Sequence, residues 1–159
     1  MTLRMTRCPK CGRGKFRPGK LAHRFSVGNA TFEGEVPAQV CTGCEEEFPA
    51  RLAVVSLQIQ AAHQLAGFGA APESIRFMRS VLLLQSKTFA ELVGVAPETV
   101  SRWEGGKRGI DGAAWALLCS MIRDKFAGTR TTLDAAIAAK EQRERPMPKR
   151  RFMLKKATP

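Results

Sequence analysis

Two Cys-x-x-Cys pairs hold most of the chemistry available to this chain. Cys8 and Cys11 form the first pair, Cys41 and Cys44 form the second, and 29 residues separate the two pairs. Each pair offers two thiolates from one tight turn, and four thiolates are a ligand set that Zn²⁺ takes in closed structural sites. The spacing therefore predicts one structural zinc ion per chain, bound by these four residues.

Other chemistries for the four cysteines are less favoured. Two disulfides require an oxidising compartment, and the chain shows no export signal. A redox pair would open a helix inside a βαβ pattern, which neither pair does. Iron would accept the same four sulfurs, although the aromatic surround of a rubredoxin-like site is missing. Four sulfur ligands leave no open position, so the metal is not expected to activate water. Nearby cationic side chains could offset the charge of the site, namely Arg7, Lys10 and Arg13.

The charge balance of the chain points to a polyanionic partner. Its 159 residues include 26 Lys and Arg against 14 Asp and Glu, a formal net charge of +12. Residues 1–24 contain eight of the basic residues and no acidic one, and residues 140–159 contain eight more. This excess favours nucleic acid ahead of a membrane surface, the alternative being a basic protein without such a partner. No stretch is apolar enough to span a membrane, so we expect a cytoplasmic protein.

Residues 1–48 are predicted to form a zinc ribbon. Loose alternation of apolar and polar residues predicts strands at 20–25, 31–35 and 36–40, with Gly28-Asn29 as one of the turns. So small a unit has too little apolar area to fold alone, and metal binding should supply much of its stability. Residues 49–71 are predicted to form a connector helix, packed through Leu52, Val55, Ile59 and residues 62–65 at helical spacing.

Residues 72–145 are predicted to form five helices. Pro72 and Pro97 each stand at a helix start, Ser86 or Gln85 is a candidate cap for the second helix, and Asp111 can cap the fourth. Residues 146–159 form a basic tail, predicted to be disordered. The expected fold class is mainly α with a small β zinc ribbon, an N-terminal ribbon domain followed by a five-helix domain.

The segment FAELVGVAPETVSRWEGGKRGI, residues 89–110, resembles the helix-turn-helix of the Cro/repressor-like (XRE) family. A Cys-x-x-Cys ribbon, a short helix and an XRE-type domain in this order resemble the MqsA-type antitoxins with their YgiT-type zinc finger, over about residues 5–126. The resemblance implies a homodimer that binds a palindromic operator on double-stranded DNA and represses a toxin–antitoxin operon. It also implies that the ribbon binds a toxin protein that cleaves messenger RNA.

The third predicted helix of the 72–145 region would be the recognition helix. Val100 and Trp103 lie three residues apart and should face the core. The opposite face and the following loop then supply the candidate DNA contacts, which are Glu98, Thr99, Ser101, Arg102, Lys107 and Arg108. A guanidinium matches guanine O6 and N7, so Arg102 is the candidate for base readout, whereas Lys107 and Arg108 suit phosphates. Two departures from the family pattern are Glu98, where an Asn commonly reads a base, and Ala96 at the expected N-cap.

Some alternatives stay open at the level of sequence. The same helical surface could belong to a module that binds only protein. The chain could also be a toxin-neutralising interaction module whose DNA binding is secondary, and an orphan regulator without a toxin has the same parts. A ribbon acting on RNA would lack the usual exposed aromatic platform. No combination of side chains resembles a catalytic set, so we do not expect an enzyme. His23, His63 and Cys119 are predicted to have packing or solvated roles.

Overall fold

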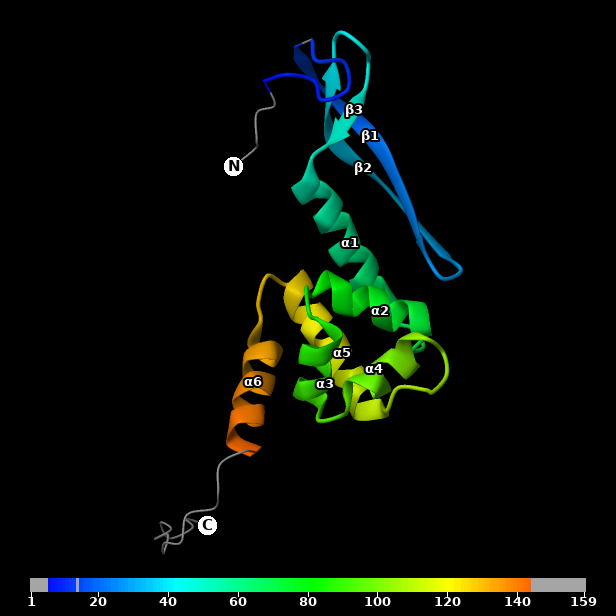
Figure 1. The fold of residues 1–159 in the computed structure, drawn as a ribbon, viewed down its shortest axis with the longest axis vertical. Helices are drawn as coiled ribbons and strands as arrows, with labels where there is room; N and C mark the ends of the chain where they lie inside the picture. Colours follow the sequence, from blue (N-terminus) through cyan, green and yellow to red (C-terminus); the bar gives the residue numbers. More distant parts are fainter. Residues whose placement is uncertain (1–5, 14, 144–159) are drawn as a thin grey trace, which may run out of the picture.

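A computed structural model describes residues 6–13 and 15–143. In this part of the chain, six helices follow a three-stranded antiparallel sheet, which confirms the predicted class of a mainly α protein with a small β part. The molecule is elongated, with the cysteine-bearing end of the sheet at one extreme and the helices at the other (Figure 1). The basic tail predicted at 146–159, and residues 144–145 of the last predicted helix, lie outside the described residues.

The sheet is a long hairpin with one short additional strand. Strands β1 (Phe16–Val27) and β2 (Ala30–Cys41) pair along their whole length, and β3 (Glu47–Pro49) pairs with the end of β2. The turn falls at Gly28-Asn29, as the sequence predicts. The division of residues 31–40 into two strands was wrong, since one continuous strand runs through Pro37.

Pro37 is tolerated inside β2 because its backbone nitrogen and carbonyl face away from β1. Its carbonyl accepts a hydrogen bond from the amide of Ala50 at 2.8 Å, so its nitrogen also faces the β3 side of the sheet. On that side β3 ends at Pro49, and no strand there needs a donor. The ladder between β1 and β2 therefore loses no hydrogen bond to the proline.

Helix α1 (Arg51–Leu65) lies along the hairpin and packs through only part of the predicted set. Ala62 and Leu65 of the predicted 62–65 region are buried, and Ile59 is half-buried. Ala61 is buried as well, and Leu57 packs against Gly34 of β2. Leu52 and Val55, predicted to pack, are exposed by 73% and 39%. The hairpin covers the face of the helix opposite Leu52 and Val55. The spacing of apolar residues in α1 alone does not show which of its faces is covered.

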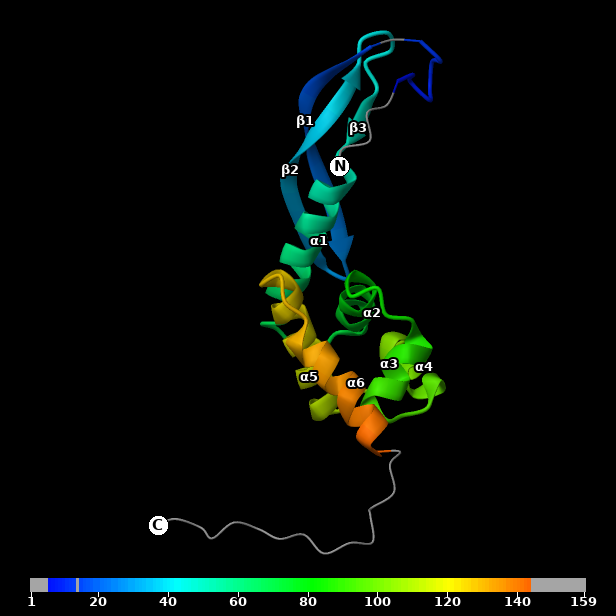
Figure 2. The same cartoon turned by 90° about the vertical axis from the view of Figure 1, so that its left-hand side faces the viewer.

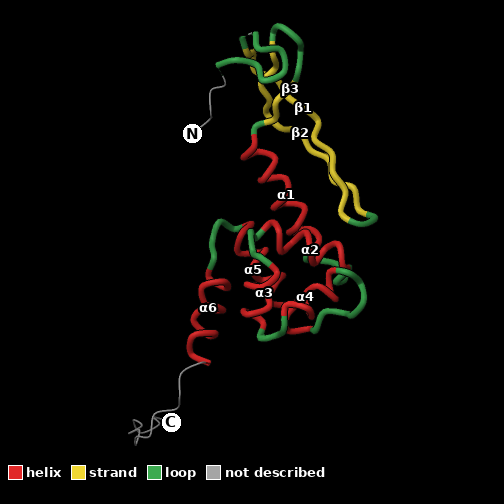
Figure 3. The backbone as a smooth tube through the Cα atoms, viewed as in Figure 1, coloured by secondary structure: helices red, strands yellow, loops and turns green. Residues whose placement is uncertain are grey.

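Five short helices complete the described chain (Figure 3). They are α2 (Pro72–Val81), α3 (Ser86–Val93), α4 (Pro97–Glu104), α5 (Gly112–Phe126) and α6 (Thr131–Arg143). Prolines open α2 and α4, and the Asp111 side chain accepts from the amide of Ala114 at 2.9 Å, as predicted. Gln85 is the N-cap of α3 but forms no side-chain cap there, so that predicted cap is absent.

The core lies among the helices and includes the far end of the hairpin. Its fully buried large side chains include Ile75, Met78, Phe89, Trp103 and Leu118. Val27, the last residue of β1, belongs to the same cluster. The Phe25 ring stacks on Phe32 at 5.5 Å and approaches Phe77 of α2 at 5.9 Å. The end of the hairpin opposite the cysteines is therefore packed on the helices.

Candidate metal centre and nucleic-acid interface

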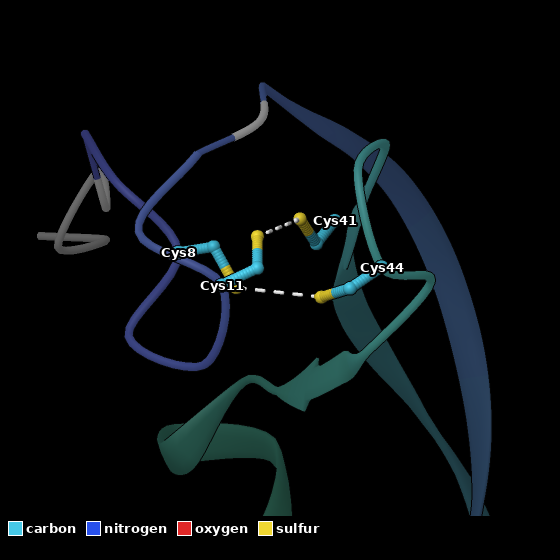
Figure 4. Close-up of side chains that lie close together, drawn as sticks. All are labelled: Cys8, Cys11, Cys41 and Cys44. Carbon is cyan, nitrogen blue, oxygen red and sulfur yellow. Dashed lines mark hydrogen bonds between the residues drawn. The ribbon is translucent and has the colours of Figure 1, made fainter.

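The four predicted cysteines converge at one end of the sheet. Their sulfur atoms all lie within 4.8 Å of one another, and the Cys8–Cys44 and Cys11–Cys41 pairs are 3.7 Å apart (Figure 4). These separations are far longer than a disulfide bond of about 2.05 Å. They match the spacing of about 3.8 Å between two sulfurs of a tetrahedron with metal–sulfur bonds of about 2.3 Å. The group could thus bind one metal ion with four sulfur ligands.

The two Cys-x-x-Cys turns have the same backbone design. The amide of Gly12 donates to the carbonyl of Cys8, and the amide of Glu45 donates to the carbonyl of Cys41, both at 2.9 Å. Gly12 and Glu45 both have left-handed backbone conformations, with φ of 67° and 58°. Glycine adopts this region without a steric cost, whereas an L-residue with a Cβ does not. The second turn therefore carries local strain that the first turn lacks.

Glu45→Gly is expected to stabilise the protein. The substitution removes a strain of about 1–2 kcal/mol, and the greater freedom of glycine in the unfolded chain offsets about 0.4–1 kcal/mol of that gain. We expect a net increase of up to about 1.6 kcal/mol in the free energy of unfolding. Denaturant titration of the metal-loaded protein measures it, with Glu45→Ala as the control that keeps the strain. Equal effects of the two substitutions would show that charge, and not backbone strain, is responsible.

The environment of the sulfurs differs between the two members of the second pair. The amide of Gly43 donates to Cys41 and, together with other bonds, lowers the pKa of its thiol to about 7. The amide of Glu46 lowers the pKa of Cys44, but burial and the neighbouring thiols outweigh it and raise this pKa to about 12. Without a cation, four thiolates would repel one another at this distance. The arrangement therefore favours a bound metal ion, which stabilises all four in the deprotonated form.

Three basic residues were predicted to offset the charge of the site, and of these Lys10 lies close to the sulfurs. Its ammonium forms an ion pair with Glu46, which raises the pKa of Lys10, and the Cys44 and Cys8 sulfurs raise it further. Arg7 and Arg13 are exposed and form no ion pair within residues 6–13 and 15–143. The carbonyl of Arg13, however, accepts from the Cys11 thiol at 3.1 Å.

The two histidines and the fifth cysteine lie outside the group of four cysteines. Cys119 is buried in α5, where desolvation raises the pKa of its thiol. His63 of α1 stacks on Phe126 of α5 with ring centroids 4.1 Å apart, and His23 lies 5.9 Å from Phe25. None of them belongs to the group of cysteines, in agreement with the packing roles predicted for them.

Helix α4 buries one face and exposes the other, as its sequence predicts. Val100 and Trp103 are fully buried, so Trp103 is a core residue and not a stacking platform. On the other side Glu98, Ser101 and Arg102 are exposed, and Thr99 is half-buried. Helix α3 precedes α4 through the three residues 94–96, and Ala96 contributes no side-chain cap.

The loop after α4 carries two more exposed cations. The amides of Lys107 and Arg108 donate to the carbonyl of Arg102 at 2.9 and 3.3 Å, which folds the loop back on the end of the helix. Arg102, Lys107 and Arg108 are all exposed, and none forms an ion pair with a residue that the structure describes. These three groups are therefore free to bind an anion.

The sequence did not reveal how α4 is anchored. Glu104, at its last position, accepts two hydrogen bonds from Arg79 of α2, one of them at 3.0 Å, and both side chains are largely buried. Arg79 also donates to the carbonyl of Leu84 at 2.6 Å, in the turn before α3. A signal was present, since Arg79 lies on the same helical face as the buried Ile75 and Met78. An arginine on an apolar face requires a buried acceptor.

A scan of protein-family models finds no match to this chain, and no curated protein matches it. In the described part of the chain, no helix combines the length and hydropathy that crossing a membrane requires.

Proposed function

We propose that this protein is a sequence-specific DNA-binding transcriptional repressor with one structural zinc ion. The observation that carries the proposal is the exposed face of α4, where Arg102 points to solvent while Val100 and Trp103 are buried, and where Lys107 and Arg108 follow in the next loop. A short helix of this kind enters the major groove with its N-terminal residues nearest the base edges. Arg102 then reads a guanine, while the two loop cations bind phosphates. The net charge of +12 supports a polyanionic partner.

We further propose that the protein acts as a homodimer on a palindromic operator. One short helix reads too few base pairs for useful specificity, and two related by symmetry read half-sites about 34–36 Å apart. Footprinting on the DNA upstream of the gene tests this proposal, with two protected half-sites as the expected result. Occupancy by a single copy, or no preference over random DNA, would contradict it.

Arg102→Ala and Lys107→Ala are expected to have different effects on binding. Loss of the Arg102 guanidinium should weaken operator binding by about 1–3 kcal/mol and relax the preference at one base pair. Loss of the Lys107 ammonium should weaken binding to operator and random DNA alike and reduce its salt dependence. Band-shift titration on both duplexes measures this, with Arg51→Ala as the control because Arg51 is exposed at the distant start of α1. Unchanged base preference in the Arg102 variant would exclude Arg102 from base readout.

A second role, as an antitoxin, is supported by the order of ribbon, helix and XRE-like segment that resembles the MqsA type. The cysteine-bearing end of the sheet projects away from the helices and leaves its surface open to a partner (Figure 1). A small ribonuclease encoded next to this gene should then co-purify with the full chain when the two are expressed together. Unrelated neighbouring genes would favour a regulator without a toxin.

A further inference from the structure

One face of helix α1 carries apolar side chains that are largely exposed. Leu52 and Val55 are exposed by 73% and 39%, and Ile59, one turn further along, is half-buried. Residues three and four positions apart lie on the same face of a helix, so these three form one line. The hairpin packs on the opposite face, where Leu57 contacts Gly34 of β2. Figure 2 shows α1 in front of the hairpin, so that the face away from the hairpin is toward the viewer.

The exposed apolar surface continues from α1 onto the end of α5. His63, four residues after Ile59, stacks on Phe126 with ring centroids 4.1 Å apart, and Phe126 is 50% exposed. We call the set of Leu52, Val55, Ile59, His63 and Phe126 the α1 patch. From Leu52 to His63 it is about 17 Å long, at a rise of about 1.5 Å per residue. A contiguous apolar patch on a protein surface marks an interaction site.

Helix α1 is also poor in charge, unlike the rest of the chain. Asp, Glu, Lys and Arg make up 25% of the sequence, whereas Arg51, at the first position, is the one such residue in α1. The exposed polar residues of the helix beyond this position are neutral, namely Ser56, Gln60 and Gln64. The cores of protein–protein interfaces are depleted of charged side chains in the same way. This surface therefore suits a protein partner and not nucleic acid, which requires cations.

The charge of the whole chain indicates which protein fits this surface. A net charge of +12 makes two copies repel each other wherever their basic surfaces meet. Two copies can approach most closely through neutral surfaces, and α1 provides one. An acidic partner would instead bind where cations are exposed, as at Lys107 and Arg108. The occupant that matches the α1 patch is thus a second copy, whose own patch is equally apolar.

We propose that two copies of this chain associate through the α1 patch, with their α1 helices antiparallel about a twofold axis. The proposal names the contact surface of the homodimer and rests on the proposed function for what that dimer does. Leu52 of one copy lies against the stacked His63 and Phe126 of the other, and Val55 lies against Ile59. Both contacts are centred near residue 57 of α1, so one axis generates them all, as a self-complementary twofold interface requires.

Leu52→Asp tests the proposal, because it places a charge in the contact and leaves the fold intact. Leu52 is 73% exposed, and an acidic side chain in the first turn of a helix is favourable. Leu83→Asp is the matched control, since Leu83 is 84% exposed and lies between α2 and α3, outside the α1 patch. Sedimentation equilibrium of the metal-loaded full chain should show a dimer. Leu52→Asp should raise its dissociation constant at least about 30-fold, and Leu83→Asp should leave it unchanged.

Circular dichroism establishes that the helices of both variants are intact. An unchanged dissociation constant for Leu52→Asp, or equal losses from the two substitutions, would overturn this inference alone. A full chain that is monomeric at every concentration would overturn it as well, and would leave the α1 patch to a different protein.

DNA binding separates the failure of this inference from the failure of the proposed function. A dimer occupies both half-sites of an operator, so Leu52→Asp should weaken binding to the full operator but not to a duplex with a single half-site. Equal weakening on both duplexes would show that Leu52 acts on the DNA contact and not on association. If the full chain does not prefer the operator over random DNA, the proposed function fails, whereas sedimentation still measures association through the α1 patch.

Discussion

Purified protein is expected to contain one zinc ion per chain, and removal of the ion should unfold the cysteine-bearing end of the sheet. Apparent binding free energies of structural zinc in small fingers are about 10–16 kcal/mol at pH 7, and most of this is folding free energy. Outside the metal centre, the first turn and β3 have little packing to hold them, as β3 has only three residues. Elemental analysis measures the ion, and amide exchange before and after chelation measures the unfolding.

The helices should survive this treatment, because their core does not include the cysteines of the metal centre. Cys44→Ser should lose the ion as chelation does, since one of four ligands is gone. Cys119→Ala is the matched control, because this fifth cysteine is buried in α5 and lies outside the group. A coloured protein that contains iron would show that the predicted ligands bind a metal but that the metal is not zinc. A preparation that is fully folded without any metal would contradict the role of the site.

The group of four cysteines was predictable because its signal is local. Two short motifs with fixed spacing specify two turns, and the pairing of Phe16 with Cys41 in the hairpin brings the turns together. The faces of α4 were predictable for a similar reason, since Val100 and Trp103 repeat at helical spacing. Both patterns depend on residues within a few positions of one another along the chain.

The packing of α1 and the course of β2 were less accessible, because they depend on distant parts of the chain. Leu52 and Val55 have the spacing of a buried face, but which face is covered depends on where the hairpin lies. Pro37 predicts a break in the strand unless β3 is known to end beside it. The strain at Glu45 was equally hidden, since the sequence gives no direct sign of a left-handed backbone at a glutamate.

Glu104→Ala is expected to have the largest effect on the helical core. The side chains of Glu104 and Arg79 are 8% and 16% exposed, so the substitution leaves a buried guanidinium without its carboxylate. Removing one partner of a buried ion pair costs about 3–5 kcal/mol. We therefore expect the midpoint of thermal unfolding to fall by about 10 °C. Operator affinity should fall as well, because Glu104 holds the end of α4 against α2.

The neighbouring Arg76 supplies the control for this prediction. Its side chain is 63% exposed and lies 3.8 Å from the same carboxylate, so Arg76→Ala should cost less than about 1 kcal/mol. Replacing both buried partners, as Arg79→Met with Glu104→Leu, should recover most of the lost stability, since no charge is then left alone. Full recovery is not expected, because the carbonyl of Leu84 loses the hydrogen bond from Arg79. Equal losses from Arg76→Ala and Glu104→Ala would show that burial of the pair does not anchor α4.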